Sequence, residues 1–174
     1  MLIKMEKFAE WFEKGKYAPY GECFDIGIGT RKAIYRYWDG IDPLECGGNS
    51  EFDNGNGSLM RILPILFYLC AKYKEITFSE EAMDIIHNIS SLTHRHKRSM
   101  IACGIYISIA HEIFLGERLL VNAVNKGISK AKKFYEEKRE YMEELKYYSR
   151  IFDNNFKNLT ENEIKSSGYV VDTL

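Results

Sequence analysis

The residues best suited to holding a ligand lie in one loop, FDNGNGSLMRILP, at positions 52–64. Its two Asn-Gly pairs, Asn54-Gly55 and Asn56-Gly57, favour positive φ and predict a tight double turn. Ser58 stands where it could cap a helix that begins directly after it. Turn amides followed by the free N–H groups of a helix N-terminus form a donor surface suited to a phosphate or a polar sugar. The same pattern is also typical of a plain surface turn, and no P-loop lysine or G-x-G-x-x-G spacing decides between the two.

A second polar stretch, SSLTHRHKRS at positions 90–99, places His94 between two apolar segments, where its side chain can face a central cavity. A catalytic base would need a nucleophile and an orienting carboxylate beside it, and the sequence identifies neither. His94 and His96 are two residues apart, so on a helix they would point to different sides and could not share a metal ion. The residues alone leave open whether His94 is structural or contacts a ligand.

Helices must position these two stretches, because apolar residues recur at spacings of three and four along most of the chain and alternating strand patterns are nearly absent. The predicted fold class is all-α. Gly15 and Gly40 are expected to close the first two helices, and Thr30 to cap the second. Pro64 belongs in the first turn of a helix, and Thr77 with Glu80 has capping-box spacing. The expected helices cover residues 2–15, 31–38, a short turn after 58, a second piece from 64, a helix opened by Thr77 that runs toward 92, 100–116, and one or two more over 118–152.

Composition and charge exclude several classes of function. The 174 residues are 45% hydrophobic, which is enough to bury the core of a single domain spanning residues 1–174. Lys and Arg number 24 against 25 for Asp and Glu, so no overall field attracts nucleic acid or an anionic membrane, and the basic residues 95–98 lack a recognition-helix pattern. Frequent charges at the N-terminus and the lack of a long apolar run predict a cytoplasmic protein without a membrane span.

Four stretches taken together resemble the ADP-ribosylglycohydrolase family, which includes dinitrogenase reductase-activating glycohydrolase. GNGSLMRILP is followed about thirty residues later by SLTHRHKRS, and both resemble motifs of that family. YGECFDIGIGTRKAI is similar to the family segment that leads into a helix, and SGYVVDTL to a segment found late in its core. The four occur in the family's order and cover nearly the whole chain.

The resemblance implies an orthogonal helical bundle that binds ADP-ribose in a cleft with two magnesium ions. It also implies hydrolysis of the bond between ADP-ribose and a modified protein side chain, arginine in many members. Carried over by motif, His94 would lie at the ligand pocket, Gly168 and Tyr169 would approach the adenosine side, and Arg61 would belong to the scaffold behind the loop. The residues implied to contact the diphosphate and ribose are Asn54, Gly55, Asn56, Gly57 and Ser58.

The sequence also departs from the family pattern. The family holds its magnesium ions with a Thr-Asp-Asp cluster near the N-terminus and an Asp-x-Asp-Thr cluster near the C-terminus, and neither occurs here. Asp172-Thr173 matches the earlier GYVVDT segment instead. The resemblance therefore implies the middle part of the family core, incomplete at both ends, with no metal ligand and no catalytic residue in this chain.

The first hypothesis that follows is a glycohydrolase-type enzyme component that is complete only with flanking or partner segments. Because magnesium needs several oxygen ligands and contributes strongly to the transition state, the isolated chain is expected to have no appreciable hydrolase activity. The helix over residues 101–114 should be partly uncovered, which would favour a complementary polypeptide that supplies the missing helices. The two alternatives are a non-catalytic module that binds ADP-ribose or a nucleotide, and a helical interaction protein.

Overall fold

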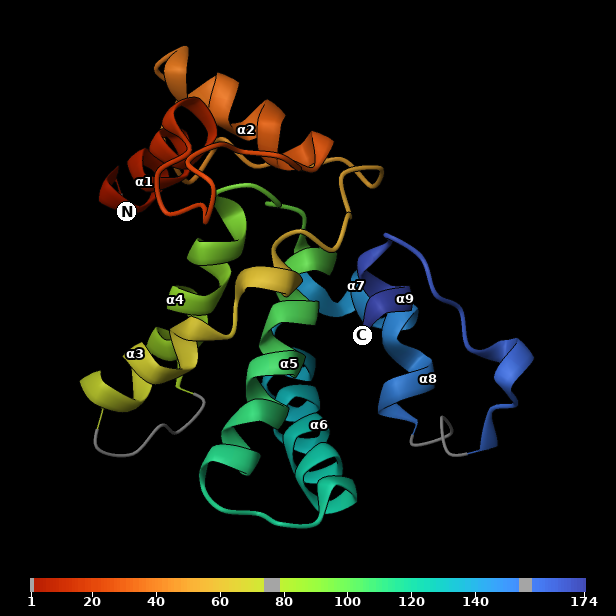
Figure 1. Ribbon diagram of the computed structural model, residues 1–174. Helices are drawn as coiled ribbons and strands as arrows, with labels where there is room; N and C mark the ends of the chain where they lie inside the picture. Colours follow the sequence, from red (N-terminus) through yellow and green to blue (C-terminus); the bar gives the residue numbers. More distant parts are fainter. Residues whose placement is uncertain (1, 74–78, 154–157) are drawn as a thin grey trace.

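A computed structural model of the chain describes residues 2–73, 79–153 and 158–174 (Figure 1). No β-strand occurs in these residues, and two isolated bridges, Gly48 with His94 and Gly55 with Tyr169, are the extended pairings present there. The all-α class is therefore confirmed. The longer helices are α1 (Leu2–Lys14), α2 (Ile28–Trp38), α3 (Pro64–Lys72), α4 (Glu80–Ser91), α5 (Lys97–Phe114) and α6 (Leu120–Glu136). The shorter elements are η1 (Leu59–Arg61), η2 (Arg139–Tyr141), α7 (Met142–Leu145), η3 (Lys146–Tyr148), α8 (Ser149–Phe152), η5 (Glu161–Glu163) and α9 (Val170–Thr173).

Helix α5 is the centre of the fold, as its apolar composition predicts. It packs against α4, α6 and α9, and Ile101, Ile105 and Ile107 along it are fully buried. Its partner α6 runs alongside it (Figure 1) and comes very close at Gly127, where a Cβ atom would lie 2.5 Å from Ile109 Cα. The absence of a side chain at this position is what lets the two backbones approach.

A buried polar network ties α4, α5 and α6 together below the site. The Tyr135 hydroxyl of α6 lies over Gly104 of α5, donates to the Met100 carbonyl at 3.3 Å and lies 2.9 Å from His87 Nε2. The Tyr141 hydroxyl meets His87 Nδ1 at 3.0 Å. Burial lowers the pKa of His87 to about 3, so this imidazole is neutral at physiological pH. Because each buried polar atom here has a partner, the network stabilises a single arrangement of the three helices.

Most of the predicted helix boundaries hold. Gly15 and Gly40 follow α1 and α2 with φ of 61° and 86°, and Pro64 occupies the first turn of α3. Helix α4 begins at Glu80 and is capped by Ser79, whose side chain accepts from Ala82 N at 3.3 Å. The predicted Thr77 cap lies outside the described residues.

The predicted caps at Thr30 and Ser58 are wrong. Helix α2 begins at Ile28, and Arg31 N donates to the carbonyl of the extended residue Gly27 at 3.0 Å, so Thr30 already lies within the first turn. Ser58 is itself helical, with φ −73° and ψ −40°, and makes no side-chain cap. Its fully buried hydroxyl instead accepts from Cys103 Sγ at 3.6 Å, because Ser58 turns into the core.

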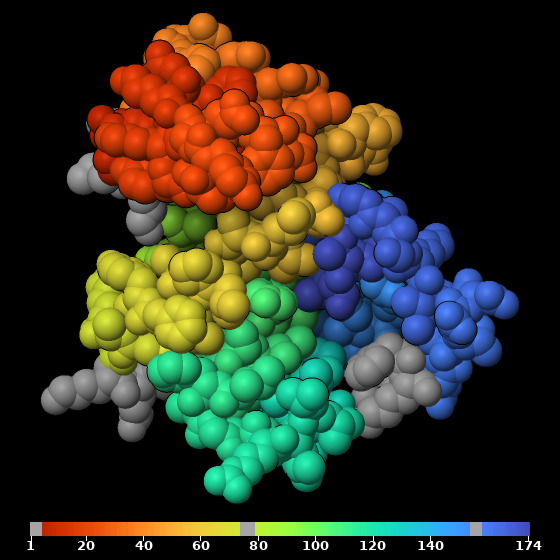
Figure 2. Space-filling view, viewed as in Figure 1, coloured from red at the N-terminus to blue at the C-terminus, as the bar shows by residue number. Residues whose placement is uncertain are grey.

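The N-terminal helices lie across one end of the bundle. Figure 2 shows their red and orange residues stacked over the yellow segment that contains the loop, η1 and α3. The middle of α5 is covered, and the exposed apolar residues within 101–114 lie at its end, where Phe114 meets Phe67 of α3 edge-on. Among the helices that the structure describes, none combines the length and the apolarity needed to cross a membrane.

Candidate functional site

The Asn-Gly loop pairs with the C-terminal segment at Gly55 and turns at residues 56–58. A turn is present at Asn56-Gly57 and absent at Asn54-Gly55. None of Asn54, Gly55, Asn56 and Gly57 has positive φ, so the predicted positive φ of both pairs is wrong. The reason is a pairing with the C-terminal segment, in which Asn56 N donates to the Gly168 carbonyl and Val170 N donates to the Asn54 carbonyl, both at 2.9 Å. Such a ladder requires extended backbone on each side, and it places Gly55 opposite Tyr169.

His94 lies directly beneath this loop. Its side chain is buried, at 4% exposure, and its backbone pairs with Gly48. A Cβ atom at Gly57 would lie 2.9 Å from His94 Cε1, and one at Gly29 would lie 3.1 Å from His94 Nε2. At Gly55 the corresponding distance to Nε2 is 3.5 Å, which is ordinary contact. Gly57 and Gly29 therefore leave the space that the imidazole ring occupies.

Arg61 and Thr93 support His94 from behind. One Arg61 terminal nitrogen donates to Thr93 Oγ1 at 2.7 Å and to the Ile89 carbonyl at 3.1 Å, and the other donates to the Gly57 carbonyl at 3.3 Å. Thr93 Oγ1 in turn lies 2.8 Å from His94 Nδ1. Arg61 thus joins the loop to the end of α4, which agrees with its expected place in the scaffold.

Burial, and after it the charge of Arg61, lowers the pKa of His94 to about 4, whereas the nearby Asp53 carboxylate acts in the opposite direction. The imidazole is therefore neutral near pH 7. Burial also lowers the pKa of Arg61, to about 10, and this group still carries its proton at that pH. The site beneath the loop consequently presents one fixed cation and one neutral histidine.

A buried arginine, which the sequence presented only as one of the basic residues 95–98, holds the C-terminal segment. Arg98, 5% exposed at the start of α5, donates to the Tyr169 hydroxyl at 3.0 Å and from Nε to Glu144 Oε2 at 2.7 Å. Its guanidinium also lies 3.6 Å from the centre of the Tyr147 ring. The neighbouring Ser99 hydroxyl donates to Asn54 Oδ1 at 3.0 Å. The one sequence signal for Arg98 was a cation placed directly before the most apolar helix.

A cavity of about 640 Å³ opens beside the loop. The loop contributes Asn56 and Gly57 to its wall, and α1 contributes the aromatic side chains of Phe8 and Trp11. Asp25 adds one negative charge, and Lys7 and Arg61 add two positive charges. This cavity is wide enough for part of a drug-sized or nucleotide-sized ligand, and its mixture of aromatic and polar groups is typical of such sites.

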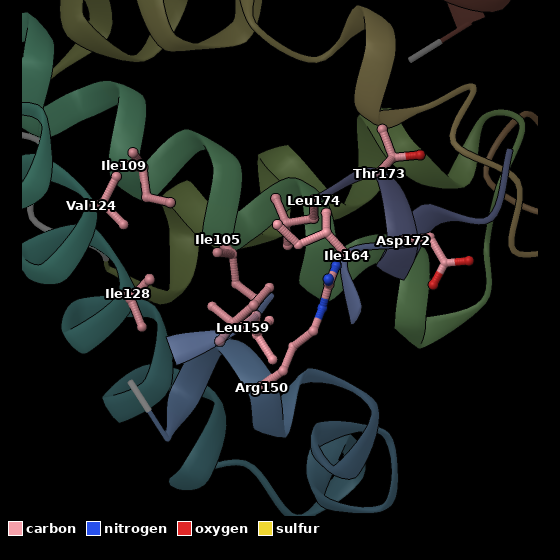
Figure 3. Close-up of a pocket in the computed structure, with 11 residues that line it drawn as sticks. Ile105, Ile109, Val124, Ile128, Arg150, Leu159, Ile164, Asp172, Thr173 and Leu174 are labelled. Atoms are coloured by element: carbon pink, nitrogen blue, oxygen red, sulfur yellow. The ribbon is translucent and has the colours of Figure 1, made fainter. Parts of the chain in front are cut away.

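A second cavity, of about 360 Å³, lies between α5, α6 and the C-terminal segments (Figure 3). Isoleucine, leucine and valine side chains form most of its wall, and Arg150 extends among them. The Arg150 guanidinium already donates to the Val171 carbonyl. This largely apolar cavity offers little that could hold a diphosphate, so the site is better placed at the loop.

The described residues do not fit a magnesium centre. No group of three or more His, Cys, Asp or Glu side chains among them is arranged to hold a metal ion. Asp172 instead accepts from the Ser167 hydroxyl at 2.8 Å, and Thr173 Oγ1 accepts from the Asn56 amide at 3.1 Å. Because Mg²⁺ requires several oxygen ligands in near-octahedral geometry, no step through a metal follows from these side chains.

Comparison with known proteins identifies the family of this chain. A family model described as ADP-ribosylglycohydrolase matches residues 4–174. The chain belongs to the ADP-ribosylglycohydrolase family. Two curated proteins that are similar in sequence to this ADP-ribosylglycohydrolase chain are both named ADP-ribosylarginine hydrolase Tri1. The protein from Serratia proteamaculans (strain 568) is 30% identical over 175 residues, covering 97% of this chain and 40% of the relative. The protein from Pseudomonas putida (strain GB-1) is 27% identical over 172 residues, covering 94% of this chain and 38% of the relative.

The family member described here thus spans about two fifths of the length of these relatives. Its structure brings most of the predicted site residues together, because the Asn-Gly loop, His94, Gly168 and Tyr169 meet in one place. Ser58 stands apart, since its side chain faces Cys103 in the core. The contacts of these residues with a ligand stay predictions.

Proposed function

We propose that this chain forms the ADP-ribose-binding part of an ADP-ribosylarginine hydrolase. The observation that carries the proposal is the convergence at Gly55, which pairs with Tyr169 and where an added Cβ atom would lie nearest to His94 and Gly168. These residues come from three separate parts of the sequence. A site assembled in this way from glycines, one neutral histidine and one tyrosine suits a polar ligand that approaches the backbone closely.

The chemistry of ADP-ribose matches the groups around the loop. Gly55 and Gly57 have no side chains, so the diphosphate and ribose can come close to backbone amides. His94 lies below the same two glycines, and the Tyr169 ring, held by Arg98, provides an aromatic surface beside them. We place the diphosphate and ribose over the loop and the adenosine towards Tyr169.

The acceptor is proposed to be arginine, because both relatives are named ADP-ribosylarginine hydrolases. Hydrolysis of that bond adds water across it, with the hydroxyl joining the ribose carbon and the proton going to the guanidino nitrogen. Such a reaction needs activated water and stabilisation of the charge that develops on the ribose, which magnesium ions supply in this family's proposed chemistry. The protein partner is accordingly an ADP-ribosylated protein.

The described residues by themselves are proposed to bind ADP-ribose without hydrolysing the bond. They offer no metal-ligand cluster, and His94, with its pKa near 4, is a poor proton acceptor at pH 7. Release of ADP-ribose would therefore require magnesium ions whose ligands come from residues other than those described.

Calorimetry with ADP-ribose and a release assay on ADP-ribosylated arginine test the proposal together. We expect heat of binding with ADP-ribose and no release, with or without magnesium. His94→Leu should weaken binding about tenfold or more, since a hydrogen bond to a charged group contributes about 1.5–3 kcal/mol. Lys133→Ala, an exposed position on α6, is the matched control and should bind like the unaltered chain.

Two results would contradict the proposal. Absence of binding heat, together with no change in amide exchange of the loop, would favour the helical interaction protein. Magnesium-dependent release of ADP-ribose by this chain alone would show that the proposed division between binding and hydrolysis is wrong.

A further inference from the structure

We propose that Arg61 and Thr93 are positioning residues that hold His94 as the neutral tautomer with its proton on Nε2, so that His94 donates a hydrogen bond to an oxygen of the ligand. The tautomer concerns the free protein and stands on its own geometry. The identity of the ligand as ADP-ribose rests on the proposed function above. An experiment can therefore refute the tautomer of His94 without refuting the identity of the ligand, and the reverse.

The hydrogen bonds at Thr93 Oγ1 have a defined direction. A guanidinium group has donors and no acceptor, so the 2.7 Å contact between Arg61 and Thr93 Oγ1 makes the hydroxyl oxygen the acceptor. The hydroxyl proton then needs an acceptor of its own. In the part of the chain that the structure describes, the other partner of Thr93 Oγ1 is His94 Nδ1, at 2.8 Å. Nδ1 is therefore the acceptor and carries no proton.

The opposite tautomer would leave a buried donor without a partner. If Nδ1 carried the proton, Thr93 Oγ1 would accept from both Arg61 and His94, and its own proton would point at neither. Thr93 is buried, at 1% exposure, so water does not readily replace the lost acceptor. A buried unsatisfied donor lowers the population of such a state by about tenfold or more.

Arg61 keeps the direction of this chain of bonds fixed. Besides Thr93 it binds the carbonyl oxygens of Ile89 and Gly57, and its guanidinium lies 5.1 Å from the centre of the Phe8 ring. With these contacts on both terminal nitrogens, the guanidinium cannot easily turn away from Thr93. Because Arg61 stays protonated near pH 7, the donor to Thr93 persists wherever the protein functions.

The imidazolium form is disfavoured by the same surroundings. The charged groups that act on His94 are Arg61, which disfavours a second positive charge, and Asp53, which favours it. Burial works in the same direction as Arg61 and outweighs Asp53. The carboxylate of Asp53 is already engaged by the backbone amide and the hydroxyl of Ser50, at 3.0 and 2.7 Å. His94 is thus neutral, with its single ring proton on Nε2.

The Nε2 proton points towards the loop. Nε2 is the ring atom nearest to the Cβ positions that side chains at Gly29 and Gly55 would occupy, and no described residue accepts a hydrogen bond from it. A lone N–H donor beside two glycines selects an oxygen acceptor, such as a phosphate or a ribose hydroxyl oxygen, and repels a guanidinium or an ammonium group. Since Nδ1 is occupied by Thr93, His94 has no free lone pair with which to act as a base.

Nitrogen NMR of ¹⁵N-histidine-labelled protein tests the tautomer directly, because protonated and unprotonated ring nitrogens have well-separated shifts. The sequence contains four histidines, and the His94→Asn variant assigns the signals of His94. We expect an unprotonated Nδ1 and a protonated Nε2 at pH 7. Thr93→Val should replace this pattern with averaged shifts of two exchanging tautomers, whereas Thr93→Ser, which keeps the hydroxyl, should preserve it.

A protonated Nδ1 in the unaltered protein would overturn the proposal, and this measurement needs no substitution. Unchanged His94 signals in a folded Thr93→Val variant would overturn it as well. The signals of His87, which belongs to the separate Tyr135 and Tyr141 network, report whether each variant is folded.

Titration with ADP-ribose tests the donor role. We expect the Nε2 proton signal to move while Nδ1 remains unprotonated. Binding that leaves the Nε2 signal unmoved would refute the donor role, even if the tautomer is correct. Absence of binding would refute the proposed function, and the spectrum of the free protein would still decide the tautomer.

Discussion

The ring of His94 and the backbone of Gly57 are so close that a Cβ atom at Gly57 would lie 2.9 Å from His94 Cε1. The imidazole cannot retreat easily, because Nδ1 is held by Thr93. This pairing makes the loop and the histidine a single unit. Any side chain added to the loop at this point must displace one of them.

Substitutions of the three glycines by alanine should follow a graded order. Gly57→Ala should perturb ADP-ribose binding most, Gly29→Ala less and Gly55→Ala least, because the added methyl group would lie 2.9, 3.1 and 3.5 Å from the imidazole. We expect Gly57→Ala to destabilise the fold by about 1–3 kcal/mol, as overpacking does. Denaturant unfolding and calorimetry measure the two effects. An equal effect of all three substitutions would show that His94 moves freely.

Tyr169→Phe should loosen the C-terminal segment. It removes the hydroxyl that accepts from Arg98, and an unsatisfied buried donor costs about 1–3 kcal/mol. Hydrogen exchange at Val170 N, which pairs with the Asn54 carbonyl, should accelerate.

Arg98→Met should lower the free energy of unfolding more than Tyr169→Phe does, by about 3 kcal/mol, since it leaves Glu144 without its cation. Breaking a fully buried ion pair costs about 3–5 kcal/mol, and we expect the lower end of this range because the Glu144 side chain is 17% exposed. Equal stability of Tyr169→Phe and Arg98→Met would show that the ion pair between Arg98 and Glu144 does not stabilise the fold.

Tyr135→Phe should destabilise the protein without changing the site. His87 Nε2 would lose its partner in the buried network, at a cost of about 1–3 kcal/mol. Because Tyr135 lies between α4, α5 and α6 and does not touch the loop, the affinity for ADP-ribose should stay unchanged under conditions where the variant is folded. A reduced affinity would mean that the network positions the site as well as stabilising the core.

Stability should fall as the pH drops below about 6.5. The pKa values of His87 and His94 are lowered to about 3 and about 4 in the folded protein, so the unfolded chain takes up protons first. The stabilisation is complete above the unfolded pKa of about 6.5 and is lost progressively towards pH 4, by about 1.4 kcal/mol per pH unit for each histidine. Denaturant unfolding at pH 7, 6 and 5 measures this slope.

A variant separates the contribution of His94 from that of the other histidines. The pKa values of His96 and His111 are also lowered, chiefly by burial. His94→Asn should therefore reduce the slope by the share of one histidine, about 1.4 kcal/mol per pH unit. A slope unaffected by this substitution would show that His94 is not held neutral by the fold.

Features that depend on neighbouring residues could be predicted from the sequence. The apolar spacing predicted the all-α class and the central position of α5, and Gly15, Gly40 and Pro64 marked helix ends and starts correctly. The Asn-Gly pairs do not adopt the expected positive φ, because Asn54 and Asn56 bond to a distant segment and that pairing outweighs the local preference. Ser58 failed as a cap because its hydroxyl is buried against Cys103.

The sequence by itself determined where the helices form and which motifs place the chain in its family, since both are written in short stretches of residues. Only the tertiary structure decided that Gly55 pairs with Tyr169, that Arg98 holds this tyrosine, and that Arg61 reaches Thr93 behind His94. These contacts join residues far apart in the chain. Their partners are selected by burial and by the need to satisfy buried polar groups, and no local pattern contains that information.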